Sequence, residues 1–531
     1  MHKNIVGILS KYSRIIDFGL ISAAVLLAFS SLILQYKLIT TPLPLEIREG
    51  LMPLVTGIIL DGYSPYQKEF LPLYLNVYGL GYNLVSACFA LIFGNTFLVH
   101  RTVTAISILL LTLLTWTVIR RLHVSLVYTI AASCILYAIL VGQYSNAARP
   151  DYLGALFFWS SIYLAGFHQN RIKVLLLSVI LGVAAFYTKP YFGLFMPAVT
   201  MGLLCVGQRI NAIIYLICSI LLLILTGIFF QSQWPAYFYS TIQIHLNTNE
   251  ASTAHLIPQI RDYVVIHWGL IVILICGLYL IYVKVNRGIS GRILLRHWKS
   301  KFYSKSYGIY NSLYYIIIIF IFLCCASIWL SRNTGNYLIY FIQLCSPVLI
   351  VTSIYFSDKY NRLLGKLILT FYIVFLQMDM PNVPVYSQQY DEEIRSLIND
   401  KSLLCSSLAY YSLTTQADIY NAGSTEYFYS PLINSSENQF INERLIVSKF
   451  EHGIIENIKN KVYEKAFVES SYPSLMPKNI QDALMANYRS NRTYFIPFHY
   501  SYWRNRSLFG SGEISITIWE PITNTRDATF K

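Results

Sequence analysis

The chain has 531 residues, of which 55% are hydrophobic and only 12% are charged, and its mean hydropathy is +0.50. Soluble globular proteins carry about 25% charged residues, so this composition excludes an ordinary soluble enzyme and indicates a polytopic membrane protein. The formal net charge is +14. The positive excess lies entirely in residues 1–380, where charged loops orient membrane helices, so no nucleic-acid partner is expected.

The first apolar run, near 16–36, follows a basic start and lacks a small-residue cleavage site close behind it. It therefore predicts a retained first helix rather than a removed signal peptide. Further apolar runs along the chain are long enough, or almost long enough, to cross a membrane as helices. Together they predict about 11 transmembrane helices, near 16–36, 102–119, 124–142, 152–167, 173–188, 191–207, 210–230, 263–283, 309–330, 337–356 and 366–380.

Residues 81–94 form an apolar segment whose length is ambiguous. It has roughly 14 residues, whereas a spanning helix needs about 20. If this segment lies on the membrane surface, eighteen Lys and Arg residues of the loops fall on the N-terminal side, against two acids. The positive-inside rule favours that arrangement. The N-terminus is then cytoplasmic, and residues 37–100 and 381–531 are extracytoplasmic.

Residues 381–531 differ in character from the apolar part. Helical patterns near 390–399, 437–459 and 478–488, with strand-like runs near 494–497 and 513–519, predict one small α/β domain. Eight of the nine cysteines fall in or beside apolar runs and only Cys405 lies here, so a disulfide scaffold is excluded. The expected domains are a transmembrane domain, 1–380, and an extracytoplasmic α/β domain, 381–531.

The first outer loop begins with two glutamates and an arginine, Glu46, Arg48 and Glu49. Apolar residues recur at helical spacing over 51–60, and Pro53 suits the first turn of a helix. A helix this short is expected to lie in the membrane interface with one apolar face. The loop 37–100 is therefore read as a surface platform carrying carboxylates. As an interface carboxylate, Glu49 is expected to contribute little to the core. The alternative is that Glu46 and Glu49 are merely solvated interface charges.

Several motifs occur in a fixed order along the chain: "EIREG" at 46–50, "GYSPY" at 62–66, "NVYGLGYN" at 76–83, Arg101 leading into a helix that ends "RRL", "ARPDYLG" at 148–154, "YTKPYFG" at 187–193 and "TGNYLIYFIQL" at 334–344. This order resembles the GT-C superfamily of polytopic glycosyltransferases, especially the branch that uses polyprenyl-phosphate sugars, such as protein mannosyltransferases and the lipid A aminoarabinose transferase. The resemblance covers about 45–355.

The resemblance implies a catalytic base among the acids of the first outer loop. Many relatives have Asp-Glu where this chain has Arg48-Glu49, so the choice between Glu49 and Glu46 stays open; Glu49 is favoured because it precedes the glycine that opens the short helix. Transfer of the sugar to a hydroxyl needs a base and cations for the departing phosphate. Candidate phosphate ligands are Arg48, Arg149, Lys189 and Arg332, with Arg261 less favoured; snorkelling interface anchors are the alternative.

Three further polar residues at the outer edge are expected to bind the acceptor or to form structural pairs: Asp151, Asn76 and Tyr78. His245, Glu250, His255 and His267 lie on or near one outer loop, but their spacing matches no zinc-ligand set. Neither a metal nor a cofactor is therefore expected.

The expected activity is inverting transfer of a sugar from a polyprenyl-phosphate donor to a hydroxyl of a lipid, polysaccharide or protein, at the outer face of a bacterial inner (plasma) membrane. A flippase for a lipid-linked glycan is one alternative, although the spans are nearly free of charge and no repeated halves are found. A non-catalytic cell-envelope scaffold is the other. The sequence does not specify the sugar, the carrier length or the acceptor.

Overall fold

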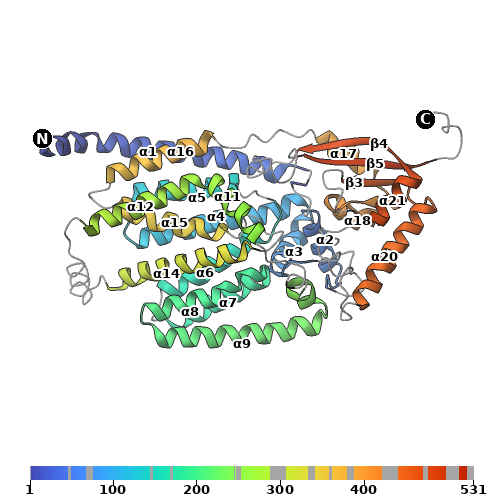
Figure 1. Ribbon diagram of the computed structural model, residues 1–531, viewed down its shortest axis with the longest axis horizontal. Coiled ribbons are helices and arrows are strands. Elements are labelled where there is room, and N and C mark those ends of the chain that lie inside the picture. Colours follow the sequence, from blue (N-terminus) through green and yellow to red (C-terminus); the bar gives the residue numbers. More distant parts are fainter. Residues whose placement is uncertain are drawn as a thin grey trace.

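The computed structural model consists of an apolar helical bundle with a mixed α/β part at one end (Figure 1). The residues that the structure describes are 2–42, 44, 45, 49–66, 76–143, 147–167, 171–243, 246, 253–286, 307–332, 341–357, 362–378, 388–420, 441–469, 476, 478–497 and 513–522.

A helix lies at each position where the sequence predicts a crossing. Helix α1 packs against α5, α4 and α16, while α6 packs against α7, α4 and α8, and α14 lies between α8 and α15. The bundle consists of α1 (His2–Thr40), α4 (Phe97–Arg121), α5 (Leu126–Gln143), α6 (Asp151–Phe167), α7 (Ile172–Thr188), the 3-10 helix η2 (Pro190–Leu194) with α8 (Phe195–Cys205), α9 (Arg209–Gln233), α11 (Thr253–Ile266) with α12 (Trp268–Asn286), α14 (Tyr307–Leu330), α15 (Ile342–Phe356) and α16 (Arg362–Met378).

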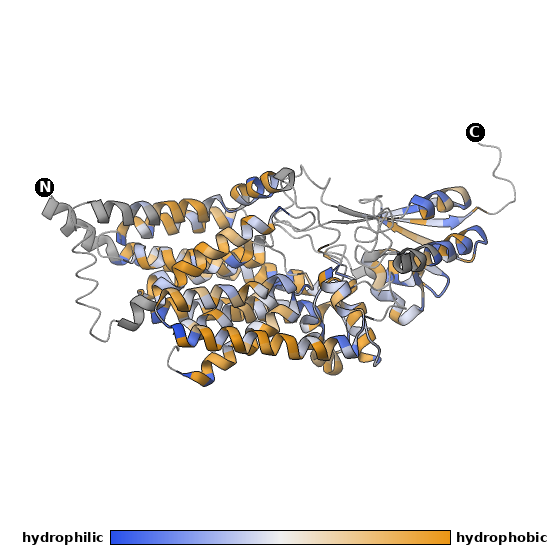
Figure 2. Cartoon of the chain, turned by 60° about the horizontal axis from the view of Figure 1, so that its bottom comes forward, coloured by the Kyte–Doolittle hydropathy of each residue, from blue (hydrophilic) through white to orange (hydrophobic). Residues whose placement is uncertain are grey.

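The helices carry the apolar surface of a membrane protein. On α9, for example, Ile213, Leu225 and Ile228 are each more than half exposed, and Figure 2 shows how hydrophobic residues dominate the bundle. Within the described residues, four helices are long and apolar enough to cross a membrane by themselves, or five if the bent pair α11–α12 forms one span. The predicted number of 11 spans therefore remains a prediction, because several bundle helices are shorter than a full crossing.

Two short helices lie at the end of the bundle that faces the α/β part: α2 (Leu51–Leu60) and α3 (Gly81–Phe93) (Figure 1). Helix α3 has 13 residues, as expected for a segment that does not cross. Helix α2 differs from the expectation of a one-faced surface helix, because all residues from Leu51 to Ile58 are buried. The cause is that α2 is covered from two directions. Helices α3 and α4 pack on it from the bundle, and two short helical segments of the C-terminal part, 406–411 and 412–415, also pack on it.

The C-terminal part contains a five-stranded sheet of order β2-β1-β3-β5-β4. Its first three strands are parallel, and the β3–β5 and β5–β4 pairs are antiparallel. The strands predicted near 494–497 and 513–519 are present but longer. The elements are α17 (Gln388–Leu397), β1 (Ser402–Leu404), the 3-10 helix η5 (Ser406–Tyr411), α18 (Ser412–Thr415), β2 (Asp418–Ile419), α20 (Ile441–Lys459), β3 (Lys465–Glu469), α21 (Lys478–Asn487), β4 (Tyr488–Pro497) and β5 (Glu513–Pro521).

The N-terminus and the C-terminal sheet lie at opposite ends of the bundle, and α2 and α3 lie at the same end as the sheet (Figure 1). The loop charges predict that 37–100 and 381–531 share the outer side of the membrane, and this remains a prediction. Which end faces the cytoplasm remains a prediction from the positive-inside rule.

Candidate functional site

Glu49 lies immediately before the first turn of α2 and is fully buried. Arg101, in the second turn of α4, is also fully buried and donates from Nε to Glu49 Oε1 (2.8 Å) and from Nη2 to Oε2 (2.7 Å). Two backbone amides complete the site: Ala148 N–H donates to Oε1 (2.6 Å) and Leu45 N–H donates to Oε2 (2.5 Å). The geometry is that of a bidentate arginine–carboxylate pair, the strongest common form of charge-assisted hydrogen bonding.

The expectation that Glu49 is an interface carboxylate contributing little to the core is therefore wrong. Each of its oxygens accepts two hydrogen bonds, so it could accept a substrate proton only after giving up some of these contacts. Arg101 was part of the sequence resemblance but had no assigned role. A charged residue in an otherwise apolar helix was the signal that could have identified it. Glu46 and Arg48 lie outside the described residues.

Arg149, Asp151 and Lys189 form a second charged group at the same end of the bundle. Asp151 is 1% exposed at the start of α6; its Oδ2 lies 3.0 Å from Arg149 Nε, and its Oδ1 accepts a hydrogen bond from Lys189 Nζ. Lys189 lies at the break between α7 and η2, where Pro190 begins the 3-10 helix. Among the described residues, two cations thus share the carboxylate of Asp151, and these three side chains together carry one excess positive charge.

Aromatic rings surround the cations of this cluster. Lys189 Nζ lies 5.3 Å from the ring centroid of Tyr78 and 5.2 Å from that of Tyr191, within the range of cation–π attraction. The Arg149 Nη2 group donates to the hydroxyl of Tyr78 at 3.4 Å. The structure thus brings together Tyr78, Arg149, Asp151 and Lys189, four of the candidate residues that the sequence places at the outer edge, while their roles remain predictions.

Asn76 does not reach the charged cluster but shapes the chain around Tyr78. Its Oδ1 accepts from Tyr78 N–H (3.2 Å), and its Nδ2 donates to the Tyr66 hydroxyl (2.9 Å), which in turn donates to the Tyr78 carbonyl (2.7 Å). Asn76 and Tyr66 are both fully buried. Of the two roles expected for Asn76, this geometry corresponds to structural pairing.

Two glycines allow residues 78–81 to approach the end of α7. A Cβ atom added to Gly79 would lie 2.1 Å from the Tyr187 carbonyl oxygen, and one added to Gly81 would lie 2.4 Å from Thr188 Oγ1. Neither distance is compatible with a side chain. Since Lys189 directly follows Thr188, this contact between the two backbones places Tyr78 beside Lys189.

The segment from Ala147 to Asp151 links the buried pair to the cation cluster. The Ala147 carbonyl accepts from Thr104 Oγ1 (3.2 Å) on α4, and the Ala148 amide donates to Glu49. Arg149 is the next residue in the chain after Ala148. The Glu49–Arg101 pair therefore fixes the backbone that presents Arg149.

The remaining candidate cations lie elsewhere. Arg332 stacks on Trp329, with Cζ 4.5 Å from the ring centroid, and Arg261 pairs with its neighbour Asp262 while 55% exposed. Both arrangements resemble interface anchors. His245 and Glu250 lie outside the described residues, as does the side chain of His255, while His267 is buried against the Tyr263 ring. Among the described residues, no three His, Cys, Asp or Glu side chains are grouped so that they could hold a metal ion.

Two of the solved structures that match this chain are glycosyltransferases by name. The archaeal oligosaccharyltransferase AglB from Archaeoglobus fulgidus, in complex with an inhibitory peptide and a dolichol-phosphate, matches over 92% of this chain and 73% of its own, at 10% identity and a TM-score of 0.48. ArnT from Cupriavidus metallidurans, in the apo state, matches over 93% of this chain and 97% of its own, at 12% identity and a TM-score of 0.45.

At 10–12% identity and with both TM-scores below 0.5, these likenesses carry no argument about the fold, substrate or mechanism of this chain. No family model matches the chain, and no curated protein matches its sequence. Any statement about chemistry therefore depends on the residues of this chain.

Proposed function

We propose that this protein transfers a sugar from a polyprenyl-phosphate donor to an acceptor hydroxyl at the outer face of the membrane. The observation that carries the proposal is the cluster that Arg149 and Lys189 form with the carboxylate of Asp151. An ammonium group has three donors and a guanidinium five, so the cluster has both the charge and the hydrogen-bonding capacity to bind an anion. Phosphate is the anion that such an arrangement suits.

A nearby apolar groove supports a lipid-linked donor. It lies between α7 and α9, has a volume of about 690 Å³, and is lined by Phe186, Tyr187, Leu223, Ile224, Gly227, Ile228, Gln231, Ser232 and Phe238. Tyr187 is two residues from Lys189. A phosphate on the cluster would thus have an apolar surface beside it for the first part of an isoprenoid tail.

The chemical step is a displacement at the anomeric carbon. The acceptor oxygen attacks this carbon as its bond to the phosphate oxygen breaks, the acceptor proton passes to a carboxylate, and polyprenyl phosphate leaves with the bonding electrons. A single displacement inverts the anomeric configuration. Arg149 and Lys189 stabilise the charge that develops on the departing phosphate, and a positioned general base contributes about 10²–10⁴ in rate.

The carboxylate that accepts the proton belongs to the stretch 46–49. Glu49 would have to leave Arg101 to serve as the base, and separating a buried ion pair is costly. Because Glu49 is held in this way, we propose Glu46 as the base and Glu49 as a positioning residue. Arg48, between them, remains a candidate phosphate ligand.

Lipid-extract mass spectrometry of a strain lacking the protein tests this function. Loss of the transferase should cause a polyprenyl-phosphate sugar to accumulate, and expression of the wild-type chain should remove it. Expression of the Lys189→Ala variant should leave the accumulated lipid in place, whereas the matched control Arg261→Ala should remove it as the wild type does. An unchanged lipid profile in the deletion strain would contradict the proposal.

A further inference from the structure

The C-terminal part contacts the first outer loop at a notch formed by Gly57. A Cβ atom added to Gly57 of α2 would lie 2.5 Å from Leu413 Cδ1 of α18 and 3.2 Å from Asn95 Nδ2. The Leu413 side chain thus occupies the space that any larger residue at position 57 would take. Asn95 closes the notch from the other side, donating to the Pro53 carbonyl at 2.8 Å.

A second contact lies at the start of α4. The rings of Phe97 and Tyr410 meet edge to face, with centroids 4.5 Å apart. Phe97 also lies beneath the guanidinium of Arg101, whose Cζ is 4.9 Å from the ring centroid. One aromatic ring therefore contacts both the C-terminal part and Arg101 of the buried pair.

These contacts explain why α2 is buried on every side. Its outward face would otherwise be exposed, and a short isolated helix is only marginally stable. The first turn of α2 starts from Glu49 itself, because Met52 N–H donates to the Glu49 carbonyl (3.1 Å). Anything that moves α2 therefore moves Glu49 and the chain leading into it.

We propose that η5 and α18 act as a positioning unit, which holds α2 in place and thereby fixes Glu49 for the transfer step. The inference rests on the proposed function and extends it by assigning a role to the C-terminal part. Leu413 and Tyr410 are positioning residues in this scheme, since they touch α2 and Phe97 rather than the charged cluster.

A size-compensation experiment on the full-length protein tests this inference. Gly57→Leu should speed hydrogen–deuterium exchange over residues 51–60 and lower kcat roughly tenfold or more, because an overfilled contact separates the two parts. Adding Leu413→Ala in the same chain should restore most of both properties. Gly453→Leu is the matched control, since nothing lies within 4 Å of a Cβ atom at Gly453.

A second variant covers the case in which Gly57→Leu does not fold. Leu413→Asp should disrupt the same contact by placing a charge against α2, with faster exchange over 51–60 and a reduced kcat. Met485→Asp, at a half-exposed position of α21, is its control. Failure of Leu413→Ala to compensate for Gly57→Leu, or unchanged exchange in Leu413→Asp, would overturn the inference.

The exchange measurement needs no substrate, so it separates this inference from the proposed function. If the wild-type protein is inactive with every lipid-linked donor, the transfer function fails, while the positioning contact is still decided by exchange. If transfer is observed but kcat is unaffected when α2 exchanges faster, the contact exists without the proposed role, and the inference is refuted.

Discussion

Glu49 and Arg101 lie 52 positions apart and form a fully buried bidentate ion pair, at 2.7 and 2.8 Å, that joins the end of α1 to α2, α4 and the chain before α6. Arg101 Nη1 also donates to the carbonyls of Leu38 and Thr41. One pair of side chains therefore holds four segments of the chain together. Its burial means that a substitution here acts on folding as well as on chemistry.

Glu49→Gln should destabilise the protein by about 3–5 kcal/mol, because it leaves the Arg101 charge buried without its partner. Thermal unfolding of the purified protein in detergent measures this loss. Glu49→Gln combined with Arg101→Met should recover part of the stability, since no buried charge then remains unpaired. Full wild-type stability of Glu49→Gln alone would contradict the buried-pair assignment.

Glu46→Gln distinguishes the catalytic base from the residue that positions it. It should retain the wild-type unfolding temperature and lose transfer by about 10²–10⁴ if Glu46 is the base. Single-turnover kinetics with saturating donor measures the loss. Near-normal turnover in Glu46→Gln, together with a well-folded but inactive Glu49→Gln, would instead assign the base to Glu49.

Arg149→Ala and Lys189→Ala should each weaken the use of donor. A charge-assisted hydrogen bond is worth about 1.5–3 kcal/mol, which corresponds to roughly 10- to 150-fold in apparent donor affinity or rate. Arg149→Lys should rescue only partly because the fork of the guanidinium is lost. Donor titration of the purified variants gives the result, with Arg261→Ala as the control; an unchanged donor affinity in both alanine variants would refute the phosphate site.

Gly79→Ala should impair the same step without touching a charged residue. The added Cβ would lie 2.1 Å from the Tyr187 carbonyl, so residues 78–81 must move away from the end of α7, and Tyr78 must move away from Lys189. We expect a raised donor KM. Gly19→Ala, with nothing within 4 Å of its Cβ position, should leave KM unchanged; the same KM in Gly79→Ala would show that the close contact is not needed.

Much of the bundle could be predicted because a membrane imposes a simple rule on sequence: apolar runs form helices. The cluster of Arg149, Asp151 and Lys189 was also within reach, since charges at the ends of apolar runs must lie near one edge. An arginine in an apolar helix marks Arg101 as a candidate, but local spacing does not show that its side chain points inward to Glu49 rather than outward.

The burial of α2 shows the other limit of sequence reasoning. Its apolar residues fit a one-faced interfacial helix, and the pattern holds no sign of η5 and α18, which lie some 350 positions later. Contacts between segments so far apart are set by tertiary packing rather than by periodicity. The sequence did not predict the contact between Gly57 and Leu413 for the same reason. A glycine in a short helix can equally indicate backbone flexibility.

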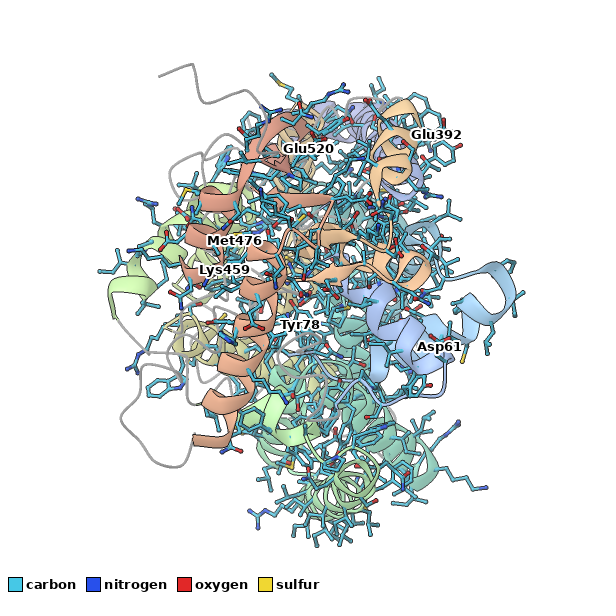
Figure 3. All side chains as sticks on the ribbon, turned by 90° about the vertical axis from the view of Figure 1, so that its right-hand side faces the viewer. Asp61, Tyr78, Glu392, Lys459, Met476 and Glu520 are labelled. Atoms are coloured by element: carbon cyan, nitrogen blue, oxygen red, sulfur yellow. The ribbon has the colours of Figure 1, made fainter. Side chains whose placement is uncertain are left out.

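The orientation of the chain can be tested by labelling. A cysteine at Ser290, in a variant whose native accessible cysteines are replaced, should resist a membrane-impermeant maleimide in intact cells, because the loop 284–305 is expected in the cytoplasm. A cysteine at Lys459, exposed on the C-terminal part (Figure 3), should react. Labelling at position 290, with protection at 459, would reverse the predicted topology.

The last prediction concerns Glu469, at the end of β3, beside the contact with α2. Its side chain is 3% exposed, and its Oε1 accepts from the amide of Ser407 (3.1 Å) and from the Ser407 hydroxyl. Burial raises the pKa of Glu469 from 4.5 to about 7, although the hydrogen bonds from Ser407 oppose the shift. Because Ser407 belongs to η5, this carboxyl group holds the segment that packs on α2.

A carboxyl group whose pKa is higher in the folded than in the unfolded state stabilises the fold most at low pH. Its contribution is complete below about pH 4.5 and is lost as the pH rises through about 7, a change on the order of 3 kcal/mol. Hydrogen exchange of β3 and η5 should therefore accelerate between pH 5 and pH 8 after correction for intrinsic exchange. Glu469→Gln should remove most of this dependence, because a neutral amide does not ionise, whereas Glu456→Gln, at an exposed position of α20, should retain it. The same pH dependence in wild type and Glu469→Gln would show that another group is responsible.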